Sequence, residues 1–279
     1  MACFQHNGHD VHFDVQGEGP ALLFMHGLAA DRRQATQALG GSDGLIGYRL
    51  ISLDMPGHGD SLLPAGSDIA GVAGFAAYTD VALALLEHLE VRKVIAGGIS
   101  MGAGIALHLA LSRPDLVEAL LLVRPAWLDA PGRPHLDVIG DIGKWIEEAG
   151  VDAAAEKLAD HPVYLTALRD NPACAASVMG ATTRPQAGAA AAVLDLLVSD
   201  RPFARMGALQ NCPVPALVVG NNADPLHPSL IAREIAGALP SGRYFHAPPK
   251  YLEPEEHRLA IINSIRDFLQ NCRSGRPAA

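Results

Sequence analysis

The sequence predicts an α/β fold in which helices cover both faces of a mostly parallel sheet. Short, continuous apolar runs alternate with amphipathic segments along most of the chain, and this alternation is typical of parallel strands joined by helices. A serine motif stands at one junction between such a run and a helix-like segment. One long stretch interrupts the alternation, which indicates a helical insertion.

The spacing of apolar residues predicts the individual elements. Residues 9–17 alternate apolar and polar side chains, whereas residues 19–27 form an apolar run that a glycine closes. Residues 72–91 show helical periodicity. Further strands are expected within 48–61, 93–97, 117–126, 214–225 and 243–249, and further helices within 103–111, 229–239 and 255–270.

The alternation stops between residues 125 and 212, where the chain is rich in alanine and shows no convincing strand. Helices are expected at roughly 143–159, 161–180 and 186–200. An insertion after one strand of a parallel sheet falls above the carboxyl ends of the strands, where such sheets bind ligands. We therefore expect a core of residues 1–124 and 213–279 and a helical lid of residues 125–212, with an ordinary packing layer as the alternative.

A G-x-S-x-G motif, residues 98–102, follows the apolar run at 93–97 and precedes a helix. This context predicts a nucleophile elbow, in which Ser100 occupies a strained turn between strand and helix. Bulky side chains at Gly98 and Gly102 would collide across that turn. The amino end of the helix directs free N–H groups at the reacting centre.

A His-Gly turn after the buried run at 19–27 predicts an oxyanion hole. The backbone N–H groups of Leu28 and Met101 are expected to face the same point and to stabilise a tetrahedral intermediate. We expect His26 to shape the turn by hydrogen bonding and to take no part in proton transfer.

Asp224 is the predicted catalytic acid. It lies in a loop after a buried strand and comes later in the chain than Ser100, which fits the order Ser, Asp, His of this architecture. A buried carboxylate there would orient a histidine and stabilise its charged form. Asp129, which follows the preceding strand, is the rival.

The residues at 24–28, 54–61, 98–102 and 220–228 stand in the order and at intervals that resemble the α/β-hydrolase family. The resemblance covers roughly residues 10 to 270. It implies an eight-stranded, mostly parallel sheet, a helical cap, a Ser-His-Asp triad and no cofactor or metal. Residues 54–61 match a loop signature of that family. The resemblance implies that Gly57, His58 and Gly59 in this loop are structural and not catalytic.

The histidine region departs from the family pattern. The family usually places its base just after the last strand, which here falls at Tyr251 or Leu252, and neither is a general base at neutral pH. His257 lies one turn into a helix that Pro254 introduces, and we predict that it is the displaced base. His246, inside the strand, is the alternative.

Two other readings of the histidines stay open. His227 is close in the chain to Asp224. We expect it to be a hydrogen-bonding loop residue, because it is too near Asp224 in the chain to be oriented by that carboxylate from across a site. The chain could also lack a triad histidine altogether.

Arg124 ends a buried strand, where a charged side chain must reach solvent or a partner. It is a candidate for binding a substrate carboxylate, and the alternative is a contact with the lid. Trp127 is a candidate for lining an apolar acyl pocket, although aromatic residues in a helical cap more often belong to the core.

Composition limits the classes of partner. The net charge of −9 over 279 residues argues against nucleic acid and against anionic membranes. The amino-terminal residues do not form a signal peptide and no apolar stretch reaches transmembrane length, so we expect a cytoplasmic protein. The four cysteines have no metal-binding spacing and are expected to be free thiols. The oligomeric state is left open.

The leading hypothesis for function is a serine hydrolase that cleaves a small-molecule carboxylic ester, thioester or lactone through an acyl-enzyme on Ser100. An acyltransferase would use the same intermediate and a different second nucleophile. A lyase, an isomerase or a ligand-binding protein on the same scaffold is the third alternative, and the irregular histidine region is its support.

Overall fold

The computed structural model describes residues 2–41, 45, 47–63, 68–184 and 187–274. Its centre is an eight-stranded sheet in the order β1-β2-β4-β3-β5-β6-β7-β8. The sheet from β4 to β8 is parallel, and β1 and β2 are antiparallel to their neighbours. The strands are β1 (Ala2–His6), β2 (His9–Gln16), β3 (Ala21–Met25), β4 (Arg49–Leu53), β5 (Val94–Ile99), β6 (Val117–Val123), β7 (Ala216–Asn221) and β8 (Gly242–Ala247). The predicted fold class is confirmed.

Seven of these strands lie where the apolar spacing predicted them, and β1 was missed. It forms a hairpin with β2, in which His6 pairs with His9 and only Asn7 and Gly8 form the loop. Both loop residues have positive φ, 48° and 80°. Asn-Gly between two short strands is a strong hairpin signal, so the sequence held the information that predicts β1.

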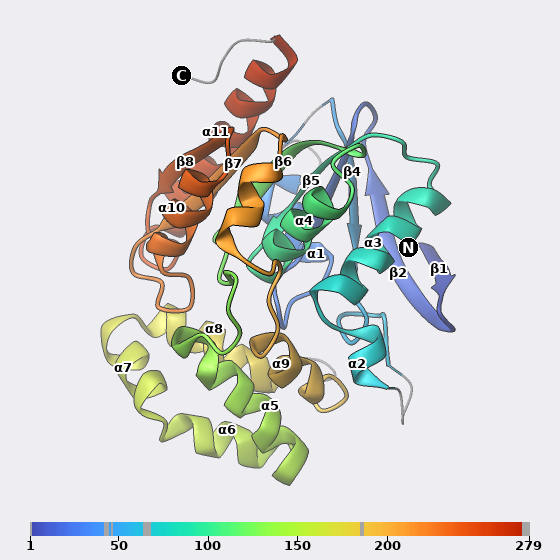
Figure 1. Cartoon of the computed structure of the whole chain (residues 1–279). Helices are drawn as coiled ribbons and strands as arrows, with labels where there is room; N and C mark the ends of the chain where they lie inside the picture. The colour runs from blue at the N-terminus through green and yellow to red at the C-terminus, as the bar shows by residue number, and fades with distance from the viewer. Residues whose placement is uncertain (1, 42–44, 46, 64–67, 185–186, 275–279) are drawn as a thin grey trace.

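Helices cover both faces of the sheet, as Figure 1 shows. The apolar residues of α3 (Phe75–His88), α4 (Met101–Ser112) and α10 (Ser229–Ala238) pack on one face, and those of α1 (Arg33–Ala38) and α11 (Pro254–Ser274) pack on the other. Successive residues of β3 alternate between the two cores, with Leu23 and Met25 in one and Leu22 and Phe24 in the other. This double burial explains why the central strands are continuously apolar.

Between β6 and β7 the described residues form helices and loops and no strand. The helices are α5 (Asp137–Ala149), α6 (Val151–Ala159), α7 (Pro162–Asp170), α8 (Pro172–Thr183) and α9 (Ala191–Val198), with two 3-10 turns, Pro134–Leu136 and Met206–Asn211. In Figure 1 α5 to α9 gather beyond one end of the sheet. A further short helix, α2 (Ile69–Val72), precedes α3.

Two of the helices expected in this region are each divided in the structure. The segment expected at 143–159 begins earlier, at Asp137, and bends at Gly150, whose φ of 87° ends α5. The segment expected at 161–180 breaks at Asn171, whose side chain accepts the N–H of Cys174 and so caps α8, with Pro172 in its first turn. The segment expected at 186–200 corresponds to α9, and its first residue lies outside the described part of the chain.

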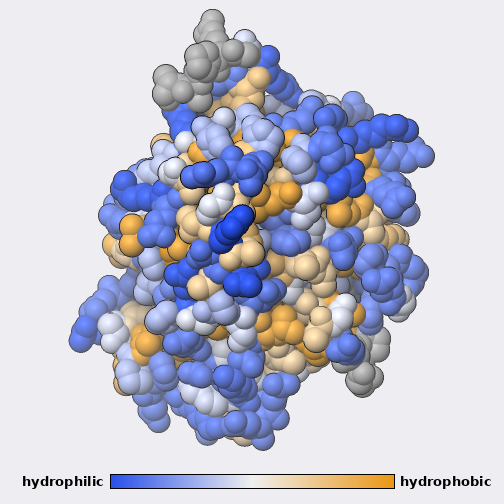
Figure 2. All heavy atoms as spheres, viewed as in Figure 1, coloured by the Kyte–Doolittle hydropathy of each residue, from blue (hydrophilic) through white to orange (hydrophobic). Residues whose placement is uncertain are grey.

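The surface on the side seen in Figure 2 is mainly hydrophilic, with the hydrophobic residues in small, separate patches. Within the described residues, no helix combines the length and the apolar character that a membrane span requires. The four cysteines are unpaired, with Cys174 and Cys212 buried.

Candidate active site

Ser100 sits at the tip of a strained turn between β5 and α4. Its φ of 56° and ψ of −110° lie outside the regions that most side chains adopt. A Cβ atom at Gly98 or Gly102 would collide with the backbone carbonyl of Met25. The glycines are therefore required by close approach of the neighbouring strand, as the motif predicts.

Two backbone N–H groups, one next to Ser100 in the sequence and one in the neighbouring turn, have no partner among the described residues. Gly27, Leu28, Ala29 and Ala30 form a tight turn that the Ala30 N–H closes on the Gly27 carbonyl at 3.1 Å, with Ala29 at a φ of 66°. Within the described residues neither the Leu28 N–H nor the Met101 N–H has a hydrogen-bond partner. Such free donors fit an oxyanion hole.

His26 stabilises the strand ends next to this turn. Its Nδ1 donates to the Gly27 carbonyl at 2.8 Å, and its Nε2 accepts the Met55 N–H at 3.0 Å. Complete burial lowers the pKa of His26, which is consistent with a neutral ring. Both ring nitrogens are occupied, so the side chain shapes the turn in the way the sequence suggested.

The histidine that meets Ser100 is His227. Its Nε2 lies 2.9 Å from the Ser100 Oγ, and its Nδ1 lies 2.9 Å from the Asp224 Oδ1. Because the Asp224 carboxylate only accepts, Nδ1 carries the proton and Nε2 is free to accept the hydroxyl proton of Ser100. Ser100, His227 and Asp224 thus form a continuous hydrogen-bonded chain of hydroxyl, imidazole and carboxylate.

A tight turn brings His227 back to Asp224. The His227 N–H donates to the Asp224 carbonyl at 3.1 Å, so the two residues occupy the first and last positions of a four-residue turn. Proximity in the chain does not prevent the contact, because the turn places both side chains on the same side. The expectation that His227 is only a loop residue is therefore wrong.

The prediction that His257 contacts Ser100 and Asp224 is also wrong. His257 lies in the first turn of α11, as expected, but its Nδ1 donates to the Pro248 carbonyl at 2.7 Å. Burial lowers the pKa of His257 to about 4. Helix α11 holds the His257 ring against the loop that precedes the helix, and the Pro248 carbonyl there accepts the ring N–H.

The alternative base, His246, is also not at the site. It is an exposed residue of β8, and its Nδ1 lies 2.7 Å from the Tyr244 hydroxyl. The rival acid Asp129 is engaged elsewhere too, since its Oδ2 accepts the Met206 N–H at 3.0 Å and its Oδ1 pairs with Arg133.

Arg124 is the other partner of Asp224. The two carboxylate oxygens are divided, with Oδ1 on His227 and Oδ2 at 2.9 Å from Arg124 Nη1. Arg124 follows β6 with a φ of 49° and is 5% exposed. Neither reading of Arg124 from the sequence included this ion pair, although a charge that ends a buried strand predicts a buried partner.

The charges of the site keep the acid ionised and the base neutral. Burial raises the pKa of Asp224, but His227 and Arg124 outweigh it and hold the pKa well below its usual value. Burial lowers the pKa of His227 from 6.5, and Asp224 opposes this shift only in part. At neutral pH an ionised carboxylate therefore orients a neutral imidazole, as a general base requires.

The site opens into a small cavity of about 100 Å³. Trp127 lines it, and the indole donates to the Leu197 carbonyl at 2.8 Å, which fixes the ring. Leu136, Ile139 and Ala181, from the helical segment between β6 and β7, also line the cavity. That segment therefore contributes to the wall above the strand ends. Within the described residues, no group of three or more His, Cys, Asp or Glu could hold a metal ion.

Comparisons with known proteins identify the family and the fold. The family model described as "alpha/beta hydrolase fold" matches residues 20–251. The curated relatives include an (E)-2-((N-methylformamido)methylene)succinate hydrolase of Acinetobacter baylyi, 26% identical over 54% of this chain and 60% of the relative. A putative carbamate hydrolase of Agrobacterium fabrum is 28% identical over 82% of this chain and 86% of the relative. The matches to the first three curated relatives span 60%, 44% and 33% of their lengths.

Solved structures show the same fold over nearly the whole chain. A thermophilic esterase from Thermogutta terrifontis has a TM-score of 0.74 and 22% identity, with 97% of both chains covered. An enol-lactonase from Burkholderia xenovorans has a TM-score of 0.68 and 22% identity, with 96% of this chain and 100% of the lactonase covered. At this level of identity the likeness bears on the fold alone.

Proposed function

Because the chain belongs to the alpha/beta hydrolase fold family, we propose that it is a serine hydrolase that cleaves a carboxylic ester, thioester or lactone. The observation that carries the proposal is the hydrogen-bonded chain from Ser100 through His227 to Asp224. The activities named for two curated relatives, both hydrolases, support hydrolysis in general. We further propose that α5 to α9, within residues 125–212, act as a cap over this site.

In the proposed mechanism His227 Nε2 takes the proton of Ser100 as Oγ attacks the substrate carbonyl. The negative charge that develops on the carbonyl oxygen is stabilised by the N–H groups of Leu28 and Met101. His227 then gives its proton to the leaving alcohol, thiol or ring oxygen, and an acyl-enzyme forms on Ser100. Water, deprotonated by the same imidazole, releases the acid and restores the serine.

The direct test is Ser100→Ala with a small aryl ester such as p-nitrophenyl acetate. We expect kcat/KM to fall by about 10⁴-fold or more while the circular dichroism spectrum is unchanged. Ser112→Ala, a change at the other end of α4, is the matched control. A fluorophosphonate probe should label the wild type and not Ser100→Ala. Turnover that survives in Ser100→Ala would exclude Ser100 as the nucleophile.

The pH dependence gives a second check on the base. Burial lowers the pKa of His227 from its usual value of 6.5, so the imidazole remains neutral at pH values somewhat below 6.5. The acidic limb of the kcat/KM profile should therefore lie below pH 6.5. An acidic limb well above that value would contradict His227 as the base.

A further inference from the structure

We propose that a second cavity beside the catalytic cavity binds a carboxylate at the far end of the substrate's acyl chain, and that Lys250 and Arg124 are its anion-binding residues. The substrate class is then an ester, thioester or lactone whose acyl part bears a second, ionised carboxyl group. This inference rests on the proposed hydrolase function and deepens it. Lys250 and Arg124 act here as specificity-determining residues, not as members of the triad.

The catalytic cavity is too small to hold a substrate alone. Its volume is about 100 Å³, whereas the cavity beside it has a volume of about 370 Å³, and ligand pockets usually measure roughly 300 to 1,000 Å³. The two cavities share Gln34, Ile99, Arg124, Lys250 and Tyr251 in their walls. A chain that leaves the carbonyl at Ser100 can therefore extend past these shared residues into the larger cavity.

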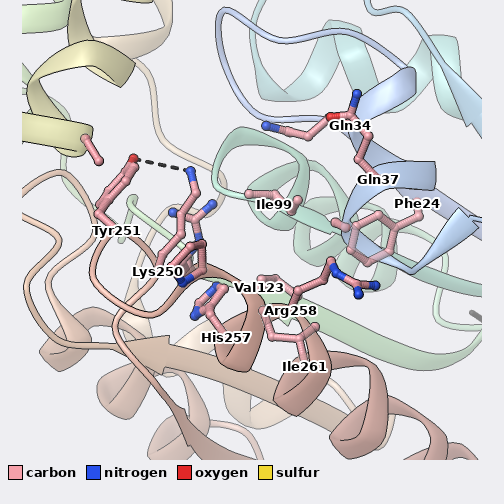
Figure 3. A pocket seen from close by; sticks show the side chains of 14 residues that line it. Phe24, Gln34, Gln37, Ile99, Val123, Lys250, Tyr251, His257, Arg258 and Ile261 are labelled. Carbon is pink, nitrogen blue, oxygen red and sulfur yellow. Dashed lines mark hydrogen bonds between the residues drawn. The ribbon is translucent and has the colours of Figure 1, made fainter.

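Lys250 stands at the boundary without an acidic partner. Its ammonium lies 3.3 Å from the Tyr251 hydroxyl and 4.4 Å from the centre of the Tyr251 ring. Among the described residues no carboxylate lies within salt-bridge distance of it. Figure 3 shows Lys250 beside Tyr251 on one side of the cavity, opposite Phe24. A partly buried ammonium is costly without a counter-charge, and an anionic ligand would supply one.

Arg124 offers a second, preorganised donor. One of its terminal nitrogens is fixed by Asp224, yet its Nε is buried with no partner among the described residues. Both carboxylate oxygens of Asp224 are already occupied, by Arg124 and by His227. The remaining guanidinium donors are therefore available to a ligand, and a carboxylate is the anion that fits their planar geometry.

The rest of the wall suits a short hydrocarbon chain. Phe24, Ile99, Val123 and Ile261 line the cavity, and among the described residues no aspartate or glutamate does. Of the remaining basic residues there, Arg258 is paired with Glu255, and the His257 ring bonds Pro248. Two donors in an apolar wall match one carboxylate better than a phosphate dianion, which carries more charge and more acceptor atoms.

The charge of Lys250 should depend on pH near neutrality. Burial lowers its pKa to about 7, Arg124 adds to the shift, and Asp224 and Cys174 oppose it. His227, Tyr251 and the ring of His257, whose own pKa is about 4, also border Lys250, and Arg258 is a further charged group in the wall of the larger cavity. A bound carboxylate would raise the pKa of Lys250, so the preference for anionic substrates should be strongest below pH 7 and should decline above it.

The experiment compares two esters that differ only in this charge: mono-p-nitrophenyl adipate and the p-nitrophenyl ester of adipic acid monoamide. At pH 6.5 the wild type should prefer the adipate by about tenfold or more in kcat/KM, as one charged hydrogen bond allows. Lys250→Met should reduce this ratio several-fold, with the remainder supplied by Arg124, and Lys250→Arg should keep most of it. Lys157→Met, which removes an exposed lysine of α6, should leave the ratio unchanged.

A ratio near unity in the wild type, or an unchanged ratio in Lys250→Met, would overturn the inference even if Ser100→Ala abolishes turnover and the hydrolase function stands. If neither ester is hydrolysed, the proposed function fails, and the cavity is tested by calorimetry with adipate and adipamic acid methyl ester. Tighter binding of adipate that is weakened in Lys250→Met would support the cavity. Equal binding of the two would overturn it.

Discussion

The loops that follow β7 and β8 both border the candidate site but contribute different chemistry. The loop after β7 provides Asp224 and His227, and their side chains bond to each other and to Ser100. The loop after β8 provides Lys250 and Tyr251, which line the cavity without contacting the nucleophile through any hydrogen bond among the described residues. One loop carries both the carboxylate and the imidazole that we propose as acid and base, and the other borders the cavity without a hydrogen bond to Ser100 among the described residues.

The base that we propose, His227, follows β7, whereas the family resemblance implies a histidine after the last strand. The eight-stranded sheet is nevertheless the one that the resemblance implies. A triad needs an imidazole at the serine, and any loop whose backbone can present one will serve. The turn at Asp224–His227 does this because the Asp224 carbonyl accepts the His227 N–H. Tyr251 and Leu252 occupy the place where the family resemblance implies a histidine.

The strongest test of the comparison replaces a histidine beside each strand. We expect His227→Ala to lower kcat/KM for p-nitrophenyl acetate by about 10⁴-fold, since members of a triad act as a unit. His246→Ala, an exposed change on β8, should stay within about twofold, as surface substitutions generally have small effects. A larger loss in His257→Ala than in His227→Ala would restore the loop after β8 as the source of the base.

A smaller loss is expected from Asp224→Asn. The amide cannot hold the imidazole tautomer as the carboxylate does, and about 10³-fold in kcat should be lost, by analogy with other triads. It also leaves Arg124 without a buried counter-charge, so the free energy of unfolding should fall by about 3 kcal/mol. Asp129→Asn is the matched control, because that carboxylate bonds outside the site. An Asp224→Asn variant with wild-type kcat would exclude Asp224 as the orienting acid.

The smallest effect concerns stability in acid. The pKa of His257 is about 4 in the folded chain and 6.5 when unperturbed, so the unfolded state binds more protons between these values. The free energy of unfolding therefore falls as the pH drops through this range. Between pH 7 and pH 4.5 the free energy of unfolding of His257→Gln should therefore fall by about 2 to 3 kcal/mol less than that of the wild type. Urea unfolding at the two pH values measures this difference. An identical pH dependence in the two proteins would show that His257 is not buried in its neutral form.

Local patterns were enough for much of the fold and for part of the site. Continuous apolar runs predict the buried strands because both faces of the sheet are covered. The glycines around Ser100 predict the elbow because nothing larger fits against Met25. The place of Asp224 after a buried strand agrees with its contact to His227, whereas the oxyanion hole of Leu28 and Met101 stays a prediction.

The tertiary structure decided which histidine faces the serine. From the sequence alone, His227, His246 and His257 are all late histidines near strand ends, and their chemistry is the same. The backbone distinguishes them: a turn folds His227 onto Asp224, β8 leaves His246 exposed, and α11 holds His257 against Pro248. The pairing of Arg124 with Asp224 and the place of the Lys250 ammonium, beside Tyr251 and away from every described carboxylate, likewise follow only from the packing of three loops from different parts of the chain. Side-chain type sets what a residue can do, but the direction in which the backbone points it sets which partner it reaches.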